Sequence, residues 1–298
     1  MVLGLWHLKL HTLPMRHGFL LIDKPTGPTS HDIVGQVRRL LGERSIGHLG
    51  TLDPFASGLL MLAVGSKALK VIELFSGLEK EYELDVVLGA VSTTYDPEGT
   101  ITSVERPLDE KPTMSDVQVA INRKFLGTID QRPPDFSAVK VGGERAYRKA
   151  RQGKAIDMPT RQVTIHTCQV QECSYPHMRV LVSASAGTYM RSLAHDLGHV
   201  LRCGAYLAGL RRTKVGDWKI EDAITPDRAA WGNVLPLKEI LKGFTGFQLS
   251  EREWNDISHG RSIEHRGEEL VGWYEDLPVA LLEKDPKKEG FVKARKVL

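Results

Sequence analysis

The order of strand-like and helix-like segments constrains the fold of this chain more than any other feature of its sequence. Residues 18–22 and 59–64 are short apolar runs bounded by turn residues, which is typical of strands. Residues 30–42 carry apolar side chains at helical spacing, with Ser30 as the expected N-cap. The same criteria predict strands at 80–91, 161–172 and 178–185 and helices at 66–77, 115–126 and 188–201. Because strands and helices do not alternate regularly, we expect an α+β fold with a mixed, mostly antiparallel sheet and flanking helices.

The composition divides the chain into unequal parts. Residues 15–243 contain most of the predicted elements and enough apolar material for one large core. From residue 244 onward, a helical stretch at 249–263 precedes short apolar runs separated by turns. This pattern predicts a small β-rich C-terminal module over 244–298. For residues 1–14 we expect either a disordered extension or a translation start at Met15.

Basic residues are concentrated in one segment, although the formal net charge of the chain is only +3. Residues 132–161 contain eight Lys or Arg and three Asp or Glu, whereas residues 251–289 contain six basic and eleven acidic residues. A basic run suits a partner such as nucleic acid, since Lys and Arg contacts to phosphates supply much of the affinity. A solvated basic face is the commoner explanation for such a run taken alone.

The sequence lacks the signatures of several other classes of protein. Cys168, Cys173 and Cys203 form no CxxC pair and accompany no histidine cluster, so we expect reduced thiols and no metal site. The sequence contains neither a Ser/His/Asp arrangement nor a phosphate-binding GxxxxGK loop. No apolar run is long enough to span a bilayer, and the N-terminus is a poor signal peptide. We therefore expect a soluble, cytoplasmic protein.

The segment from Gly47 to Gly58 is the densest candidate for a catalytic loop, within an expected loop at 43–57. It contains three glycines around His48 and Asp53 and lies between two apolar elements. No second acid stands near Asp53 in the sequence, so this residue would act as a nucleophile or base in its own right. The simpler interpretation is that Asp53 and Pro54 begin a turn.

Two further segments carry features of a binding site. After Pro133 and Pro134, a glycine pair precedes a short basic stretch with Arg145, Tyr147 and Arg148, which predicts an arm that contacts a nucleic-acid backbone. The second segment runs from Gly187, where Thr188 is the expected cap of the next helix, to Arg191. Arg191 would occupy the first helical turn, where the helix dipole disfavours a cation. Its position therefore suggests an anionic partner such as a carboxylate.

Together these segments resemble the TruB family of tRNA pseudouridine synthases. The similar motifs occur in family order between Gly18 and about Trp218. They are Gly18 to Pro25 with Thr29 to Asp32, Gly47 to Gly58, Lys80 to Tyr82, Asp96 to Gly99, Pro133 to Lys140, Gly187 to Arg191, and Leu210 to Arg212. Phe55 departs from the pattern, which has a smaller aliphatic residue there.

The resemblance implies a pseudouridine synthase fold, with residues 244–298 as a PUA-like module and residues 130–161 as an RNA-binding insertion. The implied reaction converts uridine 55 in the T-loop of tRNA to pseudouridine after the base has been flipped out of its stack. No cofactor and no metal are implied. The implied partner is tRNA, and we expect a monomer with no obligate protein partner and no membrane association.

The resemblance also assigns roles to individual residues. Asp53 would be the catalytic aspartate, Arg191 its ion-pair partner and Tyr82 the ring that stacks on the target base and acts near it in the final proton transfer. Tyr189 would line the same pocket, and His48 would contact the RNA where the nucleotide leaves its stack. Lys24 would have a structural or phosphate-contacting role. Further substrate contacts are implied for Leu210, Arg211, Lys140, Arg145 and Arg148.

Three alternatives stay open at this stage. The enzyme could modify another RNA, as the guide-dependent archaeal and eukaryotic relatives do. The protein could instead bind RNA or assist tRNA folding without catalysis, although the presence of Asp53, Tyr82 and Arg191 together argues against this. A likeness of fold alone, with unrelated acid/base chemistry, would require another set of polar residues.

Overall fold

The computed structural model describes residues 17–104, 111–137, 139–153, 156–265, 267 and 270–298. The expected extension at residues 1–14 lies outside the described residues. Within them, no helix has the length and apolar character needed to cross a membrane.

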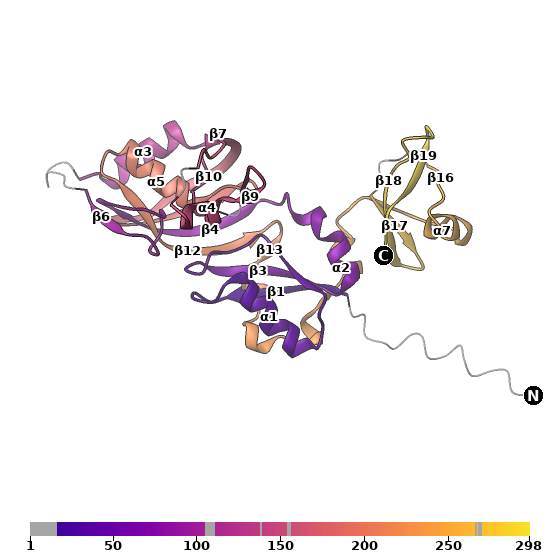
Figure 1. The fold of residues 1–298 in the computed structure, drawn as a ribbon. Helices are drawn as coiled ribbons and strands as arrows, with labels where there is room; N and C mark the ends of the chain where they lie inside the picture. The colour runs from indigo at the N-terminus through magenta and orange to yellow at the C-terminus, as the bar shows by residue number, and fades with distance from the viewer. Residues whose placement is uncertain (1–16, 105–110, 138, 154–155, 266, 268–269) are drawn as a thin grey trace, which may run out of the picture.

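One large sheet forms the centre of the molecule (Figure 1). Its main path, from edge to edge, is β14 (Leu235–Pro236), β1 (Gly18–Lys24), β3 (Ser57–Val64), β12 (Ala205–Val215), β4 (Lys80–Leu88), β11 (His177–Ala184), β10 (Arg161–Ser174) and β7 (Gly127–Gln131). Two short strands extend it, since β2 (Ile46–Leu49) pairs with β3 and β13 (Trp218–Lys219) pairs with β12. Every pairing in this sheet is antiparallel except the short one between β3 and β12. The expected α+β fold with a mostly antiparallel sheet is therefore confirmed.

Helices pack against the sheet and contribute to its hydrophobic cores. The longer ones are α1 (Ser30–Leu41), α3 (Met114–Lys124) and α5 (Met190–Val200). The shorter ones are α2 (Ser66–Val71), α6 (Leu237–Leu241) and the 3₁₀ turns η1 (Ile72–Phe75), η3 (Ile220–Asp222), η4 (Pro226–Arg228) and η5 (Trp231–Asn233). In Figure 1, α3 and α5 lie above the half of the sheet that contains β4 and β10, and α1 lies below β1. The expected helix at 66–77 is thus α2 followed by a 3₁₀ turn.

The alternation of side chains along β1 explains why this strand contributes to two cores. Leu20 and Ile22 pack with Ile33 of helix α1, whereas Phe19 and Leu21 belong to a second core that also contains Phe75. Successive side chains of a strand point to opposite faces, so a strand that is apolar at every position must be covered on both sides.

The helices begin at different residues from those expected. Thr29, not Ser30, caps α1, and Thr113 caps α3, each in a capping box with the acidic residue three positions later. Helix α5 begins at Met190, and the Thr188 hydroxyl donates to the Ser185 carbonyl instead of capping it. Each of these two capping boxes satisfies two backbone N–H groups at the start of its helix. A single capping serine would satisfy only one of them.

The expected strand at 80–91 is interrupted. Gly89 adopts a φ of 83°, which ends β4 and directs the chain into β5 (Ala90–Ser92), the partner of β6 (Ile101–Ser103). The expected pair at 161–172 and 178–185 is present as β10 and β11. The expected loop at 43–57 also contains β2, which the sequence did not suggest.

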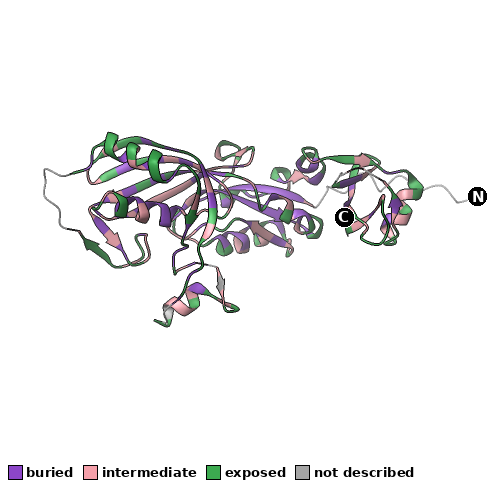
Figure 2. Cartoon of the chain, turned by 90° about the horizontal axis from the view of Figure 1, so that it is seen from above, coloured by how far each residue is buried: buried purple, intermediate pink, exposed green. Residues whose placement is uncertain are grey.

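A small arm leaves the sheet between β7 and β10. It consists of β8 (Lys140–Val141), β9 (Glu144–Arg145) and α4 (Ala146–Arg151), with a minor core of Ala146, Ile156 and Met158. Figure 2 shows it as a lobe that projects from the body of the protein. The described part of the predicted insertion at 130–161 therefore has a fold of its own at its centre.

The C-terminal part forms a separate five-stranded sheet in the order β15 (Gly246–Gln248), β17 (Val271–Tyr274), β18 (Leu277–Lys284), β19 (Phe291–Val297) and β16 (Ile263–Glu264). Helix α7 (Glu251–Ser258) packs beside it and is shorter than the helical stretch expected at 249–263. The module contacts α2 and η1, where Lys70 Nζ donates to the Val297 carbonyl at 2.6 Å and Glu73 pairs with Lys296 at 3.1 Å. The expected β-rich C-terminal module is present, while its PUA-like character and the exact domain boundaries stay predictions.

Two helical glycines provide a matched test of how tightly helix α5 packs on the sheet. A Cβ atom at Gly198 would lie 2.1 Å from the backbone nitrogen of Ala205, whereas one at Gly35 in α1 would meet only the end of a flexible arginine at 3.7 Å. We expect Gly198→Ala to lower the free energy of unfolding by about 1–3 kcal/mol because backbone atoms must move apart. Gly35→Ala should raise it by about 0.5–1 kcal/mol. Urea unfolding of both variants measures this, and equal effects would show that the close packing at Gly198 is not limiting.

Candidate active site

The loop that carries Asp53 connects β2 to β3 and is fixed from below by helix α1. The Ser30 hydroxyl donates to the Leu52 carbonyl and accepts from the Leu52 amide, both at 2.9 Å. The Gly27 amide donates to the Pro54 carbonyl at 2.8 Å. Asp53 itself opens a turn, because the Ala56 amide donates to its carbonyl at 3.1 Å. The segment can therefore be both a turn and a candidate for a catalytic loop, since the turn exposes the Asp53 carboxylate.

Lys24 holds the same loop from the end of β1. Its side chain is fully buried, and its ammonium donates to the carbonyls of Pro25 at 2.9 Å, Pro54 at 3.4 Å and Ala56 at 2.6 Å. Burial lowers the pKa of Lys24 to about 8, an effect that the nearby Asp53 carboxylate opposes. Of the two roles expected for Lys24, the geometry fits the structural one. The buried ammonium already donates to three carbonyls, and the substrate contact expected for Lys24 stays a prediction.

Arg212 supports the loop from the opposite side. Its guanidinium is buried and donates to the Leu59 carbonyl at 2.7 Å and the Gly50 carbonyl at 2.9 Å. Strand β12 runs directly beside β3 here, and a Cβ atom at Gly58 would lie 2.3 Å from the Arg212 carbonyl oxygen. A glycine at position 58, with a φ of 102°, is therefore required for the two strands to meet.

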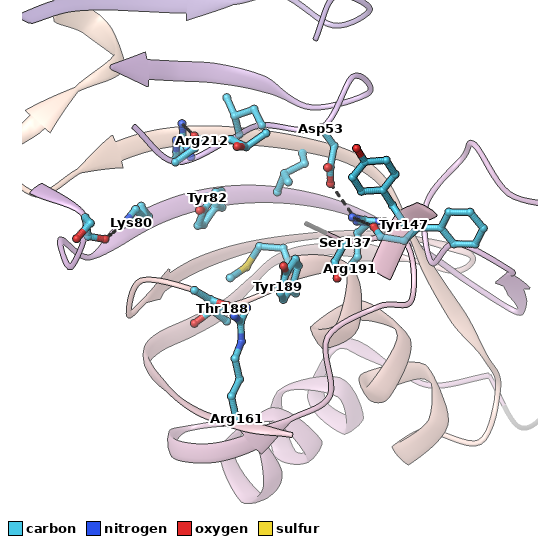
Figure 3. A pocket seen from close by; sticks show the side chains of 18 residues that line it. Asp53, Lys80, Tyr82, Ser137, Tyr147, Arg161, Thr188, Tyr189, Arg191 and Arg212 are labelled. Atoms are coloured by element: carbon cyan, nitrogen blue, oxygen red, sulfur yellow. Dashed lines mark hydrogen bonds and ion pairs between the residues drawn. The ribbon is translucent and has the colours of Figure 1, made fainter. Parts of the chain in front are cut away.

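Arg191 forms an ion pair with Asp53, as the sequence suggested. Its Nε atom lies 3.0 Å from Asp53 Oδ2 (Figure 3). Its Nη1 atom lies 3.0 Å from Asp96 Oδ2. The guanidinium also donates to the carbonyls of Thr94 at 3.2 Å and Phe136 at 2.9 Å. The side chain of Arg191 is 6% exposed and that of Asp53 is 37% exposed. The buried arginine thus fixes a carboxylate that stays accessible from the pocket.

The turn that provides Asp96 is held against helix α5. The ring of Tyr95 stacks on that of His195, with centroids 3.8 Å apart and planes 12° apart. Asp96 Oδ1 accepts from the Glu98 amide at 3.0 Å, so both oxygens of this buried carboxylate have partners. Since His195 lies one helical turn after Arg191, the stack keeps Asp96 level with the guanidinium.

Opposing effects act on the ionisation of Asp53. Burial raises the pKa of its carboxyl group, and the Asp96 carboxylate contributes in the same direction. The Arg191 guanidinium and the Lys24 ammonium act against this by favouring the charged form. The result is a pKa above the ordinary value for aspartate.

Asp53 and Arg191 line a cavity of about 520 Å³. This volume is within the range typical of small-molecule sites. Tyr82 of β4, Tyr189 and Leu210 contribute to the same wall, as expected, and Figure 3 shows Tyr82 and Tyr189 around this space. Tyr147 from the arm also lines the cavity, together with Phe136 and Ser137. The cavity therefore has aromatic rings that suit a planar base and a carboxylate that suits attack on it or on its sugar.

Other predicted binding residues lie outside this cavity. His48 lies on β2, with Nε2 3.0 Å from the hydroxyl of Thr51, a cavity residue, and burial lowers its pKa. Arg211 pairs with Asp23, with Nη atoms 3.1 and 2.9 Å from the two carboxylate oxygens. Arg145 and Arg148 are exposed on the arm, and Lys140 belongs to its strand β8. None of these residues forms part of the cavity wall.

Sequence reasoning gave no roles to several residues that shape this site. Asp96 and Arg212 stand in the quoted motifs, but nothing in their local sequence indicates that they are buried next to the loop that carries Asp53. Arg161 was expected only at the end of the basic RNA-binding insertion and the start of a strand, yet it lines the cavity. A buried charge is recognisable only when its partners are known, and those partners are distant in the sequence. Among the described residues, no His, Cys, Asp or Glu side chains gather in a group of three that could hold a metal ion.

Comparisons with known proteins agree with this geometry. The model of the TruB family pseudouridylate synthase N-terminal domain matches residues 38–190, and that of the tRNA pseudouridylate synthase B C-terminal domain matches residues 191–228. The tRNA pseudouridine synthase B of Thermobifida fusca is 41% identical over 266 residues, which cover 85% of this chain and 88% of the relative. The corresponding protein of Geobacillus thermodenitrificans is 36% identical, with 94% and 99% covered.

A solved structure extends the similarity to nearly the whole chain. The crystal structure of a Cbf5-Nop10-Gar1 complex contains a chain that is 26% identical, with a TM-score of 0.69. The match covers 95% of this chain and 85% of that one. The site geometry, the two family models and the curated relatives agree, and the chain belongs to the TruB family of pseudouridylate synthases.

Proposed function

We propose that this protein converts uridine to pseudouridine in tRNA, at position 55 of the T-loop, with Asp53 as the nucleophile. The observation that carries the proposal is the Asp53 carboxylate, held at 3.0 Å by buried Arg191 on the wall of a cavity lined by three tyrosines. Membership of the TruB family supports the reaction, and relatives named tRNA pseudouridine synthase B support tRNA as the substrate.

The reaction is an isomerisation and requires no net change in atoms. The bond between N1 of uracil and C1′ of ribose breaks, the base rotates within the cavity, and a bond forms between C5 and C1′. The proton on C5 leaves, and N1 gains one. Asp53 begins this sequence by attack on one of two electrophilic carbons. Attack on C1′ displaces uracil through N1, and C5 then displaces Asp53 from C1′ as the new bond forms. Attack on C6 forms an adduct that labilises the N1–C1′ bond, and Asp53 leaves C6 again after C5 has bonded to C1′.

Arg191 is the residue that prepares the Asp53 carboxylate for nucleophilic attack. Its guanidinium orients the carboxylate and favours the ionised form, which is the form that attacks. Asp96 and the carbonyls of Thr94 and Phe136 occupy three of its other four donors, so the guanidinium cannot rotate freely. Preorganised charge of this kind costs no rearrangement during the reaction.

Tyr82 and Tyr189 provide the surfaces for the base. Tyr82 is almost fully buried on β4, where its ring can stack on uracil and its hydroxyl can act near C5 in the last proton transfer. Base stacking on an aromatic ring offsets part of the stacking that is lost when the nucleotide is flipped, a step that costs a few kcal/mol.

The surroundings of the cavity suit contacts with the rest of the T-arm. His48 lies on β2 and Arg211 lies on β12. Arg145, Arg148 and Lys140 lie on the projecting arm. We place the RNA backbone along this arm, with the C-terminal PUA-like module of residues 244–298 as an additional RNA-contacting unit. In this proposal the enzyme is a cytoplasmic monomer that requires no protein partner and no cofactor.

The first experiment tests the reaction and the nucleophile together. We expect the wild-type protein to release one equivalent of tritium from a tRNA transcript labelled at C5 of uridine, mapped to the T-loop uridine. Asp53→Asn should bind the tRNA but release tritium at least about 10⁴-fold more slowly, since the nucleophile is lost. Asp85→Asn is a suitable control because Asp85 is an exposed residue paired with Arg179.

The outcomes separate the alternatives. Tight tRNA binding with no release by the wild-type protein would favour a role in RNA folding, and release from a different RNA would favour another substrate. Normal release by Asp53→Asn would exclude Asp53 as the nucleophile.

Asp96 provides a test of the ion-pair network. We expect Asp96→Asn to fold and to bind tRNA normally, but to lower kcat by about 10²-fold, because Arg191 loses one of the two carboxylates that fix it and Asp53 is misplaced. Single-turnover tritium release at saturating enzyme measures this step. A loss confined to KM would contradict the positioning role, and Asp85→Asn should leave both parameters unchanged.

The pH dependence of the chemical step follows from the raised pKa of Asp53. The ionised carboxylate is the active form, so the rate should fall as the pH drops through a pKa above the ordinary value of about 3.9. Because the Asp96 charge raises this pKa, Asp96→Asn should move the acidic limb to lower pH while it also lowers the plateau. Single-turnover rates across the acidic range test both effects. A limb that moves to higher pH would mean that Asp96 lowers the pKa.

A further inference from the structure

Arg161 is a preorganised cation in the wall of the cavity. It is the first residue of β10, and its guanidinium carbon lies 4.4 Å from the centroid of the Tyr189 ring. The guanidinium also donates to the Gly187 carbonyl and lies close to the Gly187 Cα, where a Cβ atom would be 3.6 Å away. Figure 3 shows Arg161 extending toward Thr188 and Tyr189. The side chain is therefore held between two residues of the segment that precedes α5.

The residue paired with Arg161 across the sheet fixes the same segment. Gln131 of β7 is the register partner of Arg161 and is 1% exposed. Its side-chain amide donates to the Tyr189 carbonyl at 3.0 Å and accepts from the Tyr189 amide at 2.8 Å. The Tyr189 backbone is thus held by Gln131 while its ring is covered by Arg161. The tyrosine has a firm support even without the arginine.

The other cations of the cavity have their charges or donors satisfied within the protein. Arg191 pairs with two carboxylates, and Arg212 donates to two carbonyls. Lys80 donates to the carbonyls of Ser76 and Leu78. Within the part of the chain that the structure describes, Arg161 pairs with no carboxylate, and its Nε atom has no hydrogen-bond partner. Its positive charge is therefore uncompensated at a position that borders the substrate cavity.

We infer that Arg161 binds a phosphate group next to the target uridine. This inference rests on the proposed function, because a uridine that enters the cavity from an RNA chain brings one phosphate on each side. A guanidinium offers a planar set of donors that matches two phosphate oxygens, and the contact supplies the missing counter-charge. The stack on Tyr189 sets the plane of the guanidinium before the RNA arrives. Arg161 thereby places the sugar of the target nucleotide relative to Asp53.

A purely structural role for Arg161, as a cover for Tyr189, makes a different prediction. Loss of a phosphate contact reduces the salt dependence of RNA binding, because fewer counterions are released on association. Loss of packing on Tyr189 alone would lower kcat and leave the salt dependence unchanged. The slope of log Kd against log salt concentration therefore distinguishes the two roles.

The test uses the full-length protein and an unmodified T-arm stem-loop RNA, with Asp53→Asn as the background for binding measurements. Adding Arg161→Gln should weaken binding about tenfold. The salt slope should fall by about 0.7–0.9. Arg161→Lys keeps the charge and should keep most of the slope. Lys242→Gln removes an exposed lysine that pairs with Glu239 on α6 and should change neither quantity.

A second arm locates the phosphate. A single uncharged methylphosphonate linkage is placed either 5′ or 3′ of the target uridine. For one of these positions, we expect the substitution to weaken binding about tenfold when Arg161 is present and only slightly in Arg161→Gln. Additive effects at both positions, or an unchanged salt slope in Arg161→Gln, would overturn the inference.

Conversion of the unmodified stem-loop by protein with Asp53 intact is followed in parallel. Absence of conversion would contradict the proposed function. Conversion with no coupling between Arg161 and either phosphate would contradict only the inference drawn from Arg161.

Discussion

The buried guanidinium of Arg191 is the interaction on which the site depends. A charge this deeply buried is tolerated only when nearly all of its donors are satisfied, and here Asp53, Asp96 and two backbone carbonyls satisfy them. These partners come from three segments that lie far apart in the sequence. One side chain thus links the catalytic loop, the turn after β5 and the entry to the arm. Because the buried guanidinium requires hydrogen-bond partners, it fixes the position of each of these three segments.

The catalytic loop is held in a similar way by two other buried cations. Lys24 and Arg212 donate mainly to backbone carbonyls of the segment from Gly50 to Leu59, so they determine the path of the chain without a hydrogen bond to the Asp53 carboxylate. Carbonyls of an irregular loop need donors when water is excluded. Desolvation of Lys24, which lowers its pKa to about 8, is the cost of this support. A rigid loop with an accessible carboxylate is the result.

Local patterns predicted the regular elements well but located their ends less well. Apolar spacing placed helix α1 and strands β3, β10 and β11, because burial of one or two faces leaves a periodic trace in the sequence. The predicted starts of α1 and α3 lie one and two residues after the observed caps, Thr29 and Thr113. The difference arises because the capping box depends on the acidic residue three positions later. The break at Gly89 was missed because a glycine inside a strand pattern is compatible with either continuation or a turn. Strand β12, which carries Arg212, was not identified as a strand, since its alternation is interrupted by polar residues.

The sequence by itself determined the family, and the resemblance to that family implied Asp53 as the candidate nucleophile and Arg191 as its partner. Motif order and a cation misplaced at a helix start are properties of the chain alone. The tertiary structure decided that Asp96 completes the pair, that Lys24 and Arg212 are supports, and that Arg161 borders the cavity with an uncompensated charge. Each of these depends on contacts between segments brought together by sheet pairing. Such distances are set by how the strands pack, and no local pattern in the sequence encodes them.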